Sequence, residues 1–290
     1  MVFRSIQQNL EGQVLAKPIL VTDKKGELHI YNSEAELTKE LLEDLRRSDY
    51  QGVYVHGDGD TISETTLSCS VQERTIHLLE LVYEPQGDFN RKIYDVMDDV
   101  TRIILNTIKK NTSLFSMVSD LSYYDDYTYG HCLNVSALSM AIGLQMGLQE
   151  KILSHLGMSG ILHDIGKQNI PISIINKPGR LSAEEVEAVR CHPLIGYDFA
   201  KRHRMPEDIC LGMLQHHEKF NGGGYPYNLH GEQISVFGRI LAVADVFDAL
   251  THKRCYHEPM SVAGAVELME KTADFDPTIL LIMEEMAKQL

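Results

Sequence analysis

A histidine and an aspartate stand side by side at the end of an apolar run in residues 160–167, which read Gly-Ile-Leu-His-Asp-Ile-Gly-Lys. The neutral imidazole of His163 and the carboxylate of Asp164 together suit borderline divalent metals such as iron, manganese or zinc. Gly166 is expected to end the helix, and Lys167 brings a positive charge beside the metal position. This layout suits a phosphate group, because a metal can bind one oxygen and an ammonium another.

A single His-Asp pair is more often an ordinary hydrogen-bonded pair, so the metal interpretation depends on other residues. Further candidate ligands recur about every 25 to 30 residues, the length of one helix and one loop. They are His131, His192, His216, His217 and Asp245. All-helical proteins build dinuclear metal sites from ligands that successive helices present inward. Seven of the 13 histidines lie between 131 and 217, which favours a metal site in this region.

Length and composition limit the fold and the partners. The 290 residues, 43% of them apolar, can form two domains, or one with an appendage, around an ordinary core. The net charge of −14 argues against binding to nucleic-acid polymers or acidic membranes, which require a basic surface. It does not exclude a small anionic substrate that is held by metals.

The sequence predicts a cytoplasmic location. No stretch approaches the ~20 apolar residues of a membrane span, and the N-terminus has no apolar signal core. The five cysteines are odd in number and show no CxxC pairing. This pattern favours a reducing compartment over a disulfide framework.

Residues 1–68 predict a small α/β module with a helix from Asn32 or Ser33 to residue 47. Its strands are expected at 13–16, 19–21, 28–31 and 51–55. The module contains no catalytic constellation, so we expect a regulatory or interaction role.

Residues 69–121 predict a helical linker whose apolar residues recur near a heptad rhythm. They are Ile93, Met97, Val100, Ile104, Ile108, Phe115 and Val118. This stripe can pack on the domain that follows, or it can pair two chains in a homodimer.

Residues 122–290 predict an all-α metal domain, because no alternating strand pattern competes with the helical one. Helices are expected at 131–146, 149–164, 183–190, 195–204, 206–216, 235–250, 261–271 and 277–288. The fold class is therefore mainly α, with an all-α C-terminal domain and a small N-terminal α/β module.

The motifs of this domain resemble a known family. Residues 126–131 (Asp-Tyr-Thr-Tyr-Gly-His) and 163–167 (His-Asp-Ile-Gly-Lys) resemble the HD phosphohydrolase superfamily. Four later segments resemble its HD-GYP subfamily: 175–181 (Ile-Asn-Lys-Pro-Gly-Arg-Leu), 192–193 (His-Pro), 216–226 (His-His-Glu-Lys-Phe-Asn-Gly-Gly-Gly-Tyr-Pro) and 243–250 (Val-Ala-Asp-Val-Phe-Asp-Ala-Leu). The resemblance runs from about residue 125 to 277, and six separated motifs in order make it specific.

The resemblance implies an HD-type helical bundle and cyclic di-GMP phosphodiesterase activity at a dinuclear, sometimes trinuclear, metal site. Carried over by position, the metal ligands are His131, His163, Asp164, His192, His216, His217 and Asp245. Asp164 would bridge two cations that hold a hydroxide for in-line attack on the phosphodiester. Lys167 would neutralise a phosphate oxygen. Asp245 or a metal-bound water would protonate the leaving 3′-oxygen.

Some members of the family carry a glutamate four residues before the first histidine, where it can hold a third metal. Tyr127 occupies that position here, and a phenol is a poor ligand. We therefore predict two divalent metals per chain. Mixed histidine and carboxylate ligands favour iron or manganese, with zinc, nickel, magnesium or calcium as alternatives.

Several residues outside the ligand set are candidates for substrate binding. Lys177, Gly179 and Arg180 can form a cationic loop over a phosphate, or they can be a solvated entry to a helix. Tyr225, after a flexible glycine run, can line the site and contact a guanine, or it can pack on the protein and shape a partner-binding surface. Arg254 could reach a phosphate or a guanine.

The resemblance, together with these features, implies a metal-dependent phosphodiesterase that opens cyclic di-GMP to pGpG, GMP or both. Protein partners are expected at the Gly-Tyr-Pro loop or the N-terminal module. One alternative is a cyclic di-GMP receptor with little or no turnover, which the complete ligand set disfavours. The other is an HD hydrolase of another nucleotide, which the intact Gly-Tyr-Pro and Lys-Pro-Gly segments disfavour.

Overall fold

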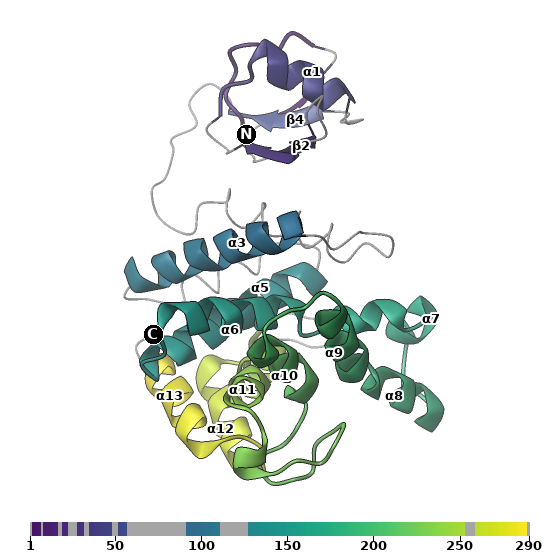
Figure 1. Cartoon of the computed structure of the whole chain (residues 1–290), viewed down its shortest axis with the longest axis vertical. Coiled ribbons are helices and arrows are strands. Elements are labelled where there is room, and N and C mark those ends of the chain that lie inside the picture. The colour runs from purple at the N-terminus through teal and green to yellow at the C-terminus, as the bar shows by residue number, and fades with distance from the viewer. Residues whose placement is uncertain are drawn as a thin grey trace. The chain divides into compact units, whose positions relative to one another are not determined.

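The computed structural model describes residues 2–6, 8–16, 19–22, 28–31, 35–47, 52–56, 91–110, 127–252 and 259–288. Contacts divide the chain into two compact units, residues 1–78 and residues 79–290, which we describe separately. Figure 1 labels their helices and strands.

The described part of the first unit is a small α/β structure, as predicted. Strand β1 (Val2–Ser5) pairs antiparallel with β4 (Gly52–Val55), and β2 (Ile19–Thr22) pairs antiparallel with β3 (Leu28–Tyr31). Helix α1 (Lys39–Arg47) packs its leucines into a core with residues from both sheets. The sequence prediction missed β1, whose partner is about 50 residues away, and residues 13–16 form only isolated bridges.

Helix α1 begins later than the Asn32 or Ser33 start that the sequence suggested. The hydroxyl of Thr38 accepts a hydrogen bond from the backbone N–H of Leu41 at 3.2 Å. Thr38 therefore caps the helix, and its side chain supplies an acceptor that the first turn otherwise lacks.

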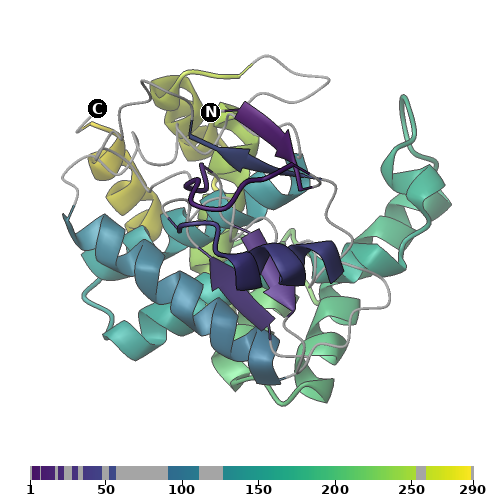
Figure 2. The same ribbon diagram turned by 90° about the horizontal axis from the view of Figure 1, so that it is seen from above.

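Every regular element among the described residues of the second unit is a helix, which confirms the all-α prediction. The α-helices are α3 (Arg91–Lys110), α5 (Tyr127–Gln145), α6 (Glu150–Leu162), α7 (Ile172–Ile175), α8 (Ala183–Arg190), α9 (His192–Arg202), α10 (Glu207–Gln215), α11 (Val236–Thr251), α12 (Val262–Thr272) and α13 (Pro277–Ala287). Two short 3₁₀ turns, η1 (Ile165–Asn169) and η2 (Gly231–Gln233), were not predicted. Helices α7 and α8 project to one side of this unit (Figures 1 and 2).

Helix α3 packs on α6 and α5 along the apolar stripe that the sequence analysis identified. Met97, Val100, Ile104 and Ile108 are buried there. Within this stripe the Thr101 hydroxyl lies 2.7 Å from the Ser154 hydroxyl on α6. The stripe therefore packs within its own unit, the first of the two alternatives. Its predicted continuation, Phe115 and Val118, lies outside the described residues.

Helices α5 and α6 form the centre of the unit and cross at very short range. A side-chain carbon added to Gly160 would lie 2.7 Å from the Ser136 Cα and 2.9 Å from the Ser136 nitrogen. Only glycine permits this approach, because any side chain would meet the backbone of α5. The crossing sets the distance between His131, on α5, and His163, just after α6.

We predict that Gly160→Ala destabilises the protein. Glycine to alanine in a helix usually stabilises it by about 1 kcal/mol, but here overpacking should lower the free energy of unfolding by about 1–3 kcal/mol. Urea denaturation of the full chain measures the change. The matched control is Gly196→Ala on α9, where the added carbon would meet nothing nearer than 3.4 Å. Equal stability of both variants would contradict the close crossing.

Candidate metal centre

The structure brings the seven candidate ligands into two groups. One contains Asp164, His192, His216 and His217, and the other contains His131, His163 and Asp245. Within each group the potential ligand atoms all lie within 4.8 Å of one another. The rings of His163, in one group, and His216, in the other, are 5.0 Å apart, so the two groups adjoin.

Most of these ligands lie at or just beyond the ends of helices. Helix α6 ends at Leu162, so His163 is its C-cap and Asp164 begins the turn η1. The prediction that Gly166 ends the helix is therefore wrong. Gly166 lies within η1, where an added side-chain carbon would sit 2.1 Å from the His192 carbonyl oxygen, so glycine is needed to let η1 meet α9.

Three of the histidines share one hydrogen-bonding pattern. In each, Nδ1 lies near the backbone carbonyl three residues earlier: His163 at 2.8 Å from Gly160, His192 at 2.7 Å from Val189 and His216 at 2.7 Å from Met213. A carbonyl only accepts, so Nδ1 carries the hydrogen and donates it. Each Nε2 therefore keeps a lone pair that is available to a cation.

The Nε2 atoms of these histidines face one another and Asp164. Because each ring carries its hydrogen on Nδ1, no hydrogen bond joins them. His192 Nε2 lies 3.2 Å from His216 Nε2 and 3.2 Å from the Asp164 Oδ1. His163 Nε2 and Asp164 Oδ1 are buried and have no hydrogen-bond partner among the described residues. Unsatisfied buried acceptors are costly, and a divalent cation would satisfy them together. The residues present therefore fit a metal.

The charge states of the metal-free cluster also suit a cation. Burial opposes the charge of Asp164, but Lys167 and His163 hold the pKa of this carboxyl well below its usual range. Burial lowers the pKa of His217 to about 4 and, with the neighbouring histidines, lowers that of His216 well below its usual value. An ionised carboxylate and neutral imidazoles are the forms that bind metals.

His131 behaves differently from the other histidines. Burial opposes its protonation, but Asp245 and Asp248 raise the pKa of His131 to about 10. Its Nε2 lies 3.2 Å from Asp245 Oδ1, and its Nδ1 lies 2.7 Å from Asp248 Oδ2. The sequence analysis did not assign a role to Asp248. Its spacing of three residues from Asp245 on one helix was the available signal.

Lys167 lies beside the cluster, as predicted from its position after the His-Asp pair. Its Nζ donates a hydrogen bond to Asp164 Oδ2 at 2.6 Å. Burial opposes its charge, but Asp164 raises the pKa of Lys167 above its usual value. The Asp164 carboxylate therefore turns Oδ2 to the ammonium and His163, and Oδ1 to His192.

Tyr225 packs against a ligand histidine. Its ring stacks on His217 with centroids 4.8 Å apart, and the Arg190 guanidinium lies over it at 5.3 Å. The buried Glu218 carboxylate accepts hydrogen bonds from the backbone N–H groups of Tyr227 and Leu229, at 2.6 and 3.0 Å. The Gly-Tyr-Pro loop is thus tied to the segment that carries the ligand pair, and Tyr225 lies at the site.

The other predicted substrate contacts lie apart from these interactions. Lys177, Gly179 and Arg180 lie in the exposed loop between α7 and α8, where Lys177 donates to Glu185 at 2.6 and 2.8 Å. The lysine charge is therefore matched within the projecting segment, and phosphate binding by this loop stays a prediction. Arg254 lies outside the described residues.

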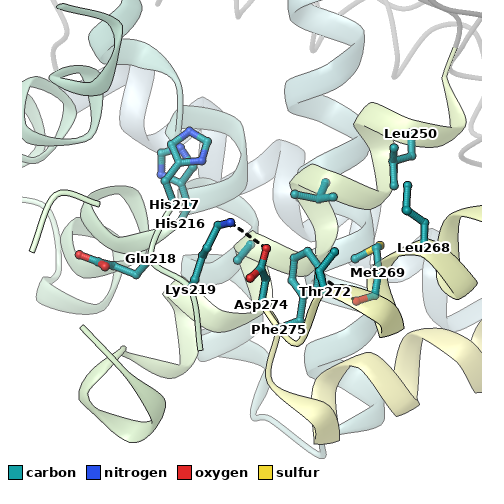
Figure 3. Close-up of a pocket in the computed structure, with 12 residues that line it drawn as sticks. His216, His217, Glu218, Lys219, Leu250, Leu268, Met269, Thr272, Asp274 and Phe275 are labelled. Atoms are coloured by element: carbon teal, nitrogen blue, oxygen red, sulfur yellow. Dashed lines mark hydrogen bonds and ion pairs between the residues drawn. The ribbon is translucent and has the colours of Figure 1, made fainter. Parts of the chain in front are cut away.

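A cavity of about 310 Å³ adjoins the ligand pair on another side. Its apolar wall comes from α11 and α12, and the Lys219–Asp274 ion pair, at 2.8 Å, lies along it. In Figure 3 the imidazoles of His216 and His217 point away from this ion pair. The cavity therefore borders the segment that carries His216 and His217, on the side away from the metal cluster.

Comparisons with known proteins agree with this geometry. A family model described as HD domain matches residues 99–279. A cyclic di-GMP phosphodiesterase of Pseudomonas aeruginosa is 38% identical over 190 residues, which cover 64% of this chain and 44% of that protein. The cyclic di-GMP phosphodiesterase response regulator RpfG of Xanthomonas campestris is 35% identical over 173 residues, 58% of this chain and 46% of that protein. The chain spans less than half the length of either relative.

A solved structure shares the fold. A Bdellovibrio bacteriovorus protein described as a HDG"Y"P protein superposes with a TM-score of 0.67 at 19% identity, covering 99% of both chains. None of the described helices combines the length and the apolar composition needed to cross a bilayer.

The lowered pKa of His217 predicts a pH dependence of the metal-free protein. Between pH 6.5 and about 4, His217 is protonated in the unfolded chain but not in the folded one. Unfolding then takes up a proton, so the stability contribution of this group is lost as pH falls through that window. We expect His217→Gln to lose less free energy of unfolding than wild type between pH 7 and pH 5, measured by urea denaturation without metal. Parallel losses in the two proteins would contradict a neutral imidazole at the partly buried His217.

Proposed function

Because the chain belongs to the HD domain family, we propose that it is a metal-dependent phosphodiesterase that hydrolyses cyclic di-GMP to pGpG, GMP or both. The observation that carries this proposal is the pair of adjoining ligand groups, with inward lone pairs and Lys167 beside them. The names of the two relatives support the choice of cyclic di-GMP as substrate.

We assign the two groups to two divalent cations, with iron or manganese favoured by the mixed ligands. When bound, such a pair activates water and stabilises the charge of a phosphodiester under in-line attack. Asp164 would serve both positions, which is supported by the 3.2 Å from its Oδ1 to His192 Nε2 and the 3.4 Å from its Oδ2 to His163 Nε2.

Lys167 is the residue we assign to the substrate phosphate. Its ammonium lies next to Asp164, so a phosphate at the cluster can accept a hydrogen bond from it as negative charge builds up. Asp245 is assigned as a ligand, and Asp245 or a metal-bound water would protonate the leaving 3′-oxygen. Burial opposes the charge of Asp245, but His131 and neighbouring histidines lower the pKa of this carboxyl, so it is ionised as a ligand must be.

The remaining parts of the chain complete the proposal. Residues 122–290 are the catalytic domain, residues 69–121 lead into it, and residues 1–68 are a regulatory or interaction module. Helix α3 packs on α5 and α6, so the leading segment can couple to the helix that carries His131. The protein is proposed to act in the cytoplasm, with partners binding the module or the Gly-Tyr-Pro loop.

The first test is hydrolysis by anaerobically purified full chain whose metal content is measured on the same sample. We expect turnover of cyclic di-GMP, and Asp164→Ala should lower it by more than the ~10–100-fold typical of residues that only support ligands. The matched control is the exposed Asp198→Ala on α9. Turnover of only cyclic GMP-AMP or a nucleoside triphosphate would contradict the substrate, and binding without cleavage would indicate a receptor.

The second test concerns Tyr225. Because the ring stacks on a ligand histidine, Tyr225→Ala should lower kcat/KM for cyclic di-GMP by about 2- to 10-fold, the effect of losing about 0.5–1.5 kcal/mol of aromatic contact. Tyr225→Phe keeps the stack and should remain near wild type. A loss in Tyr225→Phe as large as in Asp164→Ala would instead place the phenol in the chemistry.

A further inference from the structure

The Nδ1 atom of His131 hydrogen-bonds to a carboxylate, whereas Nδ1 of three other candidate ligand histidines hydrogen-bonds to a backbone carbonyl. The Nδ1 atoms of His163, His192 and His216 face carbonyl groups, whereas Nδ1 of His131 lies 2.7 Å from Asp248 Oδ2. Asp248 is completely buried. Because a carboxylate at this distance accepts the Nδ1 hydrogen, it fixes the tautomer that leaves Nε2 for a ligand role.

A second histidine stands behind Asp248. Its other oxygen, Oδ1, lies 2.7 Å from Nδ1 of His252, and Nε2 of His252 lies 3.2 Å from the Asn134 amide nitrogen. An amide nitrogen only donates, so His252 Nε2 accepts and its Nδ1 carries the hydrogen. If the Asn134 amide were turned around, its oxygen would accept a hydrogen from His252 Nε2. The Nδ1 lone pair of the neutral ring would then face the Asp248 carboxylate.

The carboxylate of Asp248 therefore lies against two imidazoles: Oδ2 accepts the Nδ1 hydrogen of His131, and Oδ1 contacts Nδ1 of His252 without hydrogen-bond geometry. An asparagine could keep an acceptor toward His131, but it would remove the negative charge that faces both rings. The four residues join two helices, because His131 and Asn134 lie one turn apart on α5, and Asp248 lies one turn before His252 at the end of α11. The network thus fixes the position of the ring as well as its tautomer.

The network also makes the two ligand groups electrostatically different. The His131 group has the carboxylates of Asp245 and Asp248 around one imidazole, at 3.2 and 2.7 Å. In the other group the Asp164 carboxylate is paired with Lys167 at 2.6 Å, and the nearest oxygen of Asp245 lies 4.0 Å from His217 Nδ1. Once a cation displaces the Nε2 proton of His131, the charges of Asp245 and Asp248 act on it together, so the cation is attracted more strongly to this group.

We propose that Asp248 is a positioning residue, supported by His252 and Asn134, that makes the His131–His163–Asp245 group the tighter of two unequal metal sites. This inference rests on the metal centre of the proposed function and deepens it. The metals bind in sequence, and the His131 group fills first.

The test is titration of metal-free full chain with Mn²⁺, with free Mn²⁺ read from its electron paramagnetic resonance signal. Wild type should bind a tighter and a weaker equivalent. Asp248→Asn should weaken the tighter one by about 10- to 100-fold, the usual effect of losing an outer partner of a ligand histidine, and leave the weaker one within about 3-fold. The matched control is Asp208→Asn, which alters a second His–Asp pair, His155 with Asp208 at 2.7 Å, outside both ligand groups.

Thermal unfolding of the metal-free proteins separates positioning from general stability. If Asp248→Asn does not fold, His252→Ala, which keeps the carboxylate, should weaken the tighter site by a few-fold. Wild-type affinity at both sites in Asp248→Asn, or an equal loss at both, would overturn the inference. Two equal sites in wild type would overturn it as well. If wild type binds no Mn²⁺, the metal centre itself fails, and the proposed function fails with it.

Discussion

The second unit depends on a buried contact that the protein by itself cannot satisfy. The Nε2 lone pairs of His192 and His216 face each other at 3.2 Å, with an oxygen of Asp164 beside them. Backbone carbonyls hold both rings in this orientation, so neither can turn away. The fold therefore maintains an arrangement of acceptors that is unfavourable without a cation and favourable with one.

Much of the packing can be understood as the means of holding these acceptors in place. Gly160 lets α6 approach α5, and Gly166 lets the turn after α6 approach the start of α9. Glu218 ties the Gly-Tyr-Pro loop to the end of α10, so Tyr225 covers His217. Residues that carry no chemistry of their own thus set distances on which the ligands depend.

The asymmetry of the cluster follows from the same construction. Asp164 shares its charge with Lys167, which faces the position that we assign to the phosphate. The carboxylate of Asp248 instead lies against His131 and His252, 2.7 Å from a ring nitrogen of each. Asp164 therefore lies beside the position that we assign to the phosphate, whereas Asp248 supports a candidate ligand, His131, from behind.

The sequence by itself determined the family, the helices and the identity of the candidate ligands. The resemblance to HD phosphohydrolases is confirmed by the family model over residues 99–279, and the predicted metal-domain helices agree with the structure within a few residues. Local signals carry this information, because apolar periodicity and capping residues act over one or two turns. The ligand roles themselves stay a prediction, although the structure gathers all seven residues.

Only the tertiary structure decided how those residues are grouped and supported. It divided the ligands between two groups, placed Asp248 behind His131, and paired Lys177 with Glu185. It also showed that Gly166 serves a close approach to α9 and does not end α6. These outcomes depend on contacts between residues far apart in the chain, such as the 117 positions that separate His131 from Asp248. Local periodicity cannot encode such contacts, because helix packing sets them.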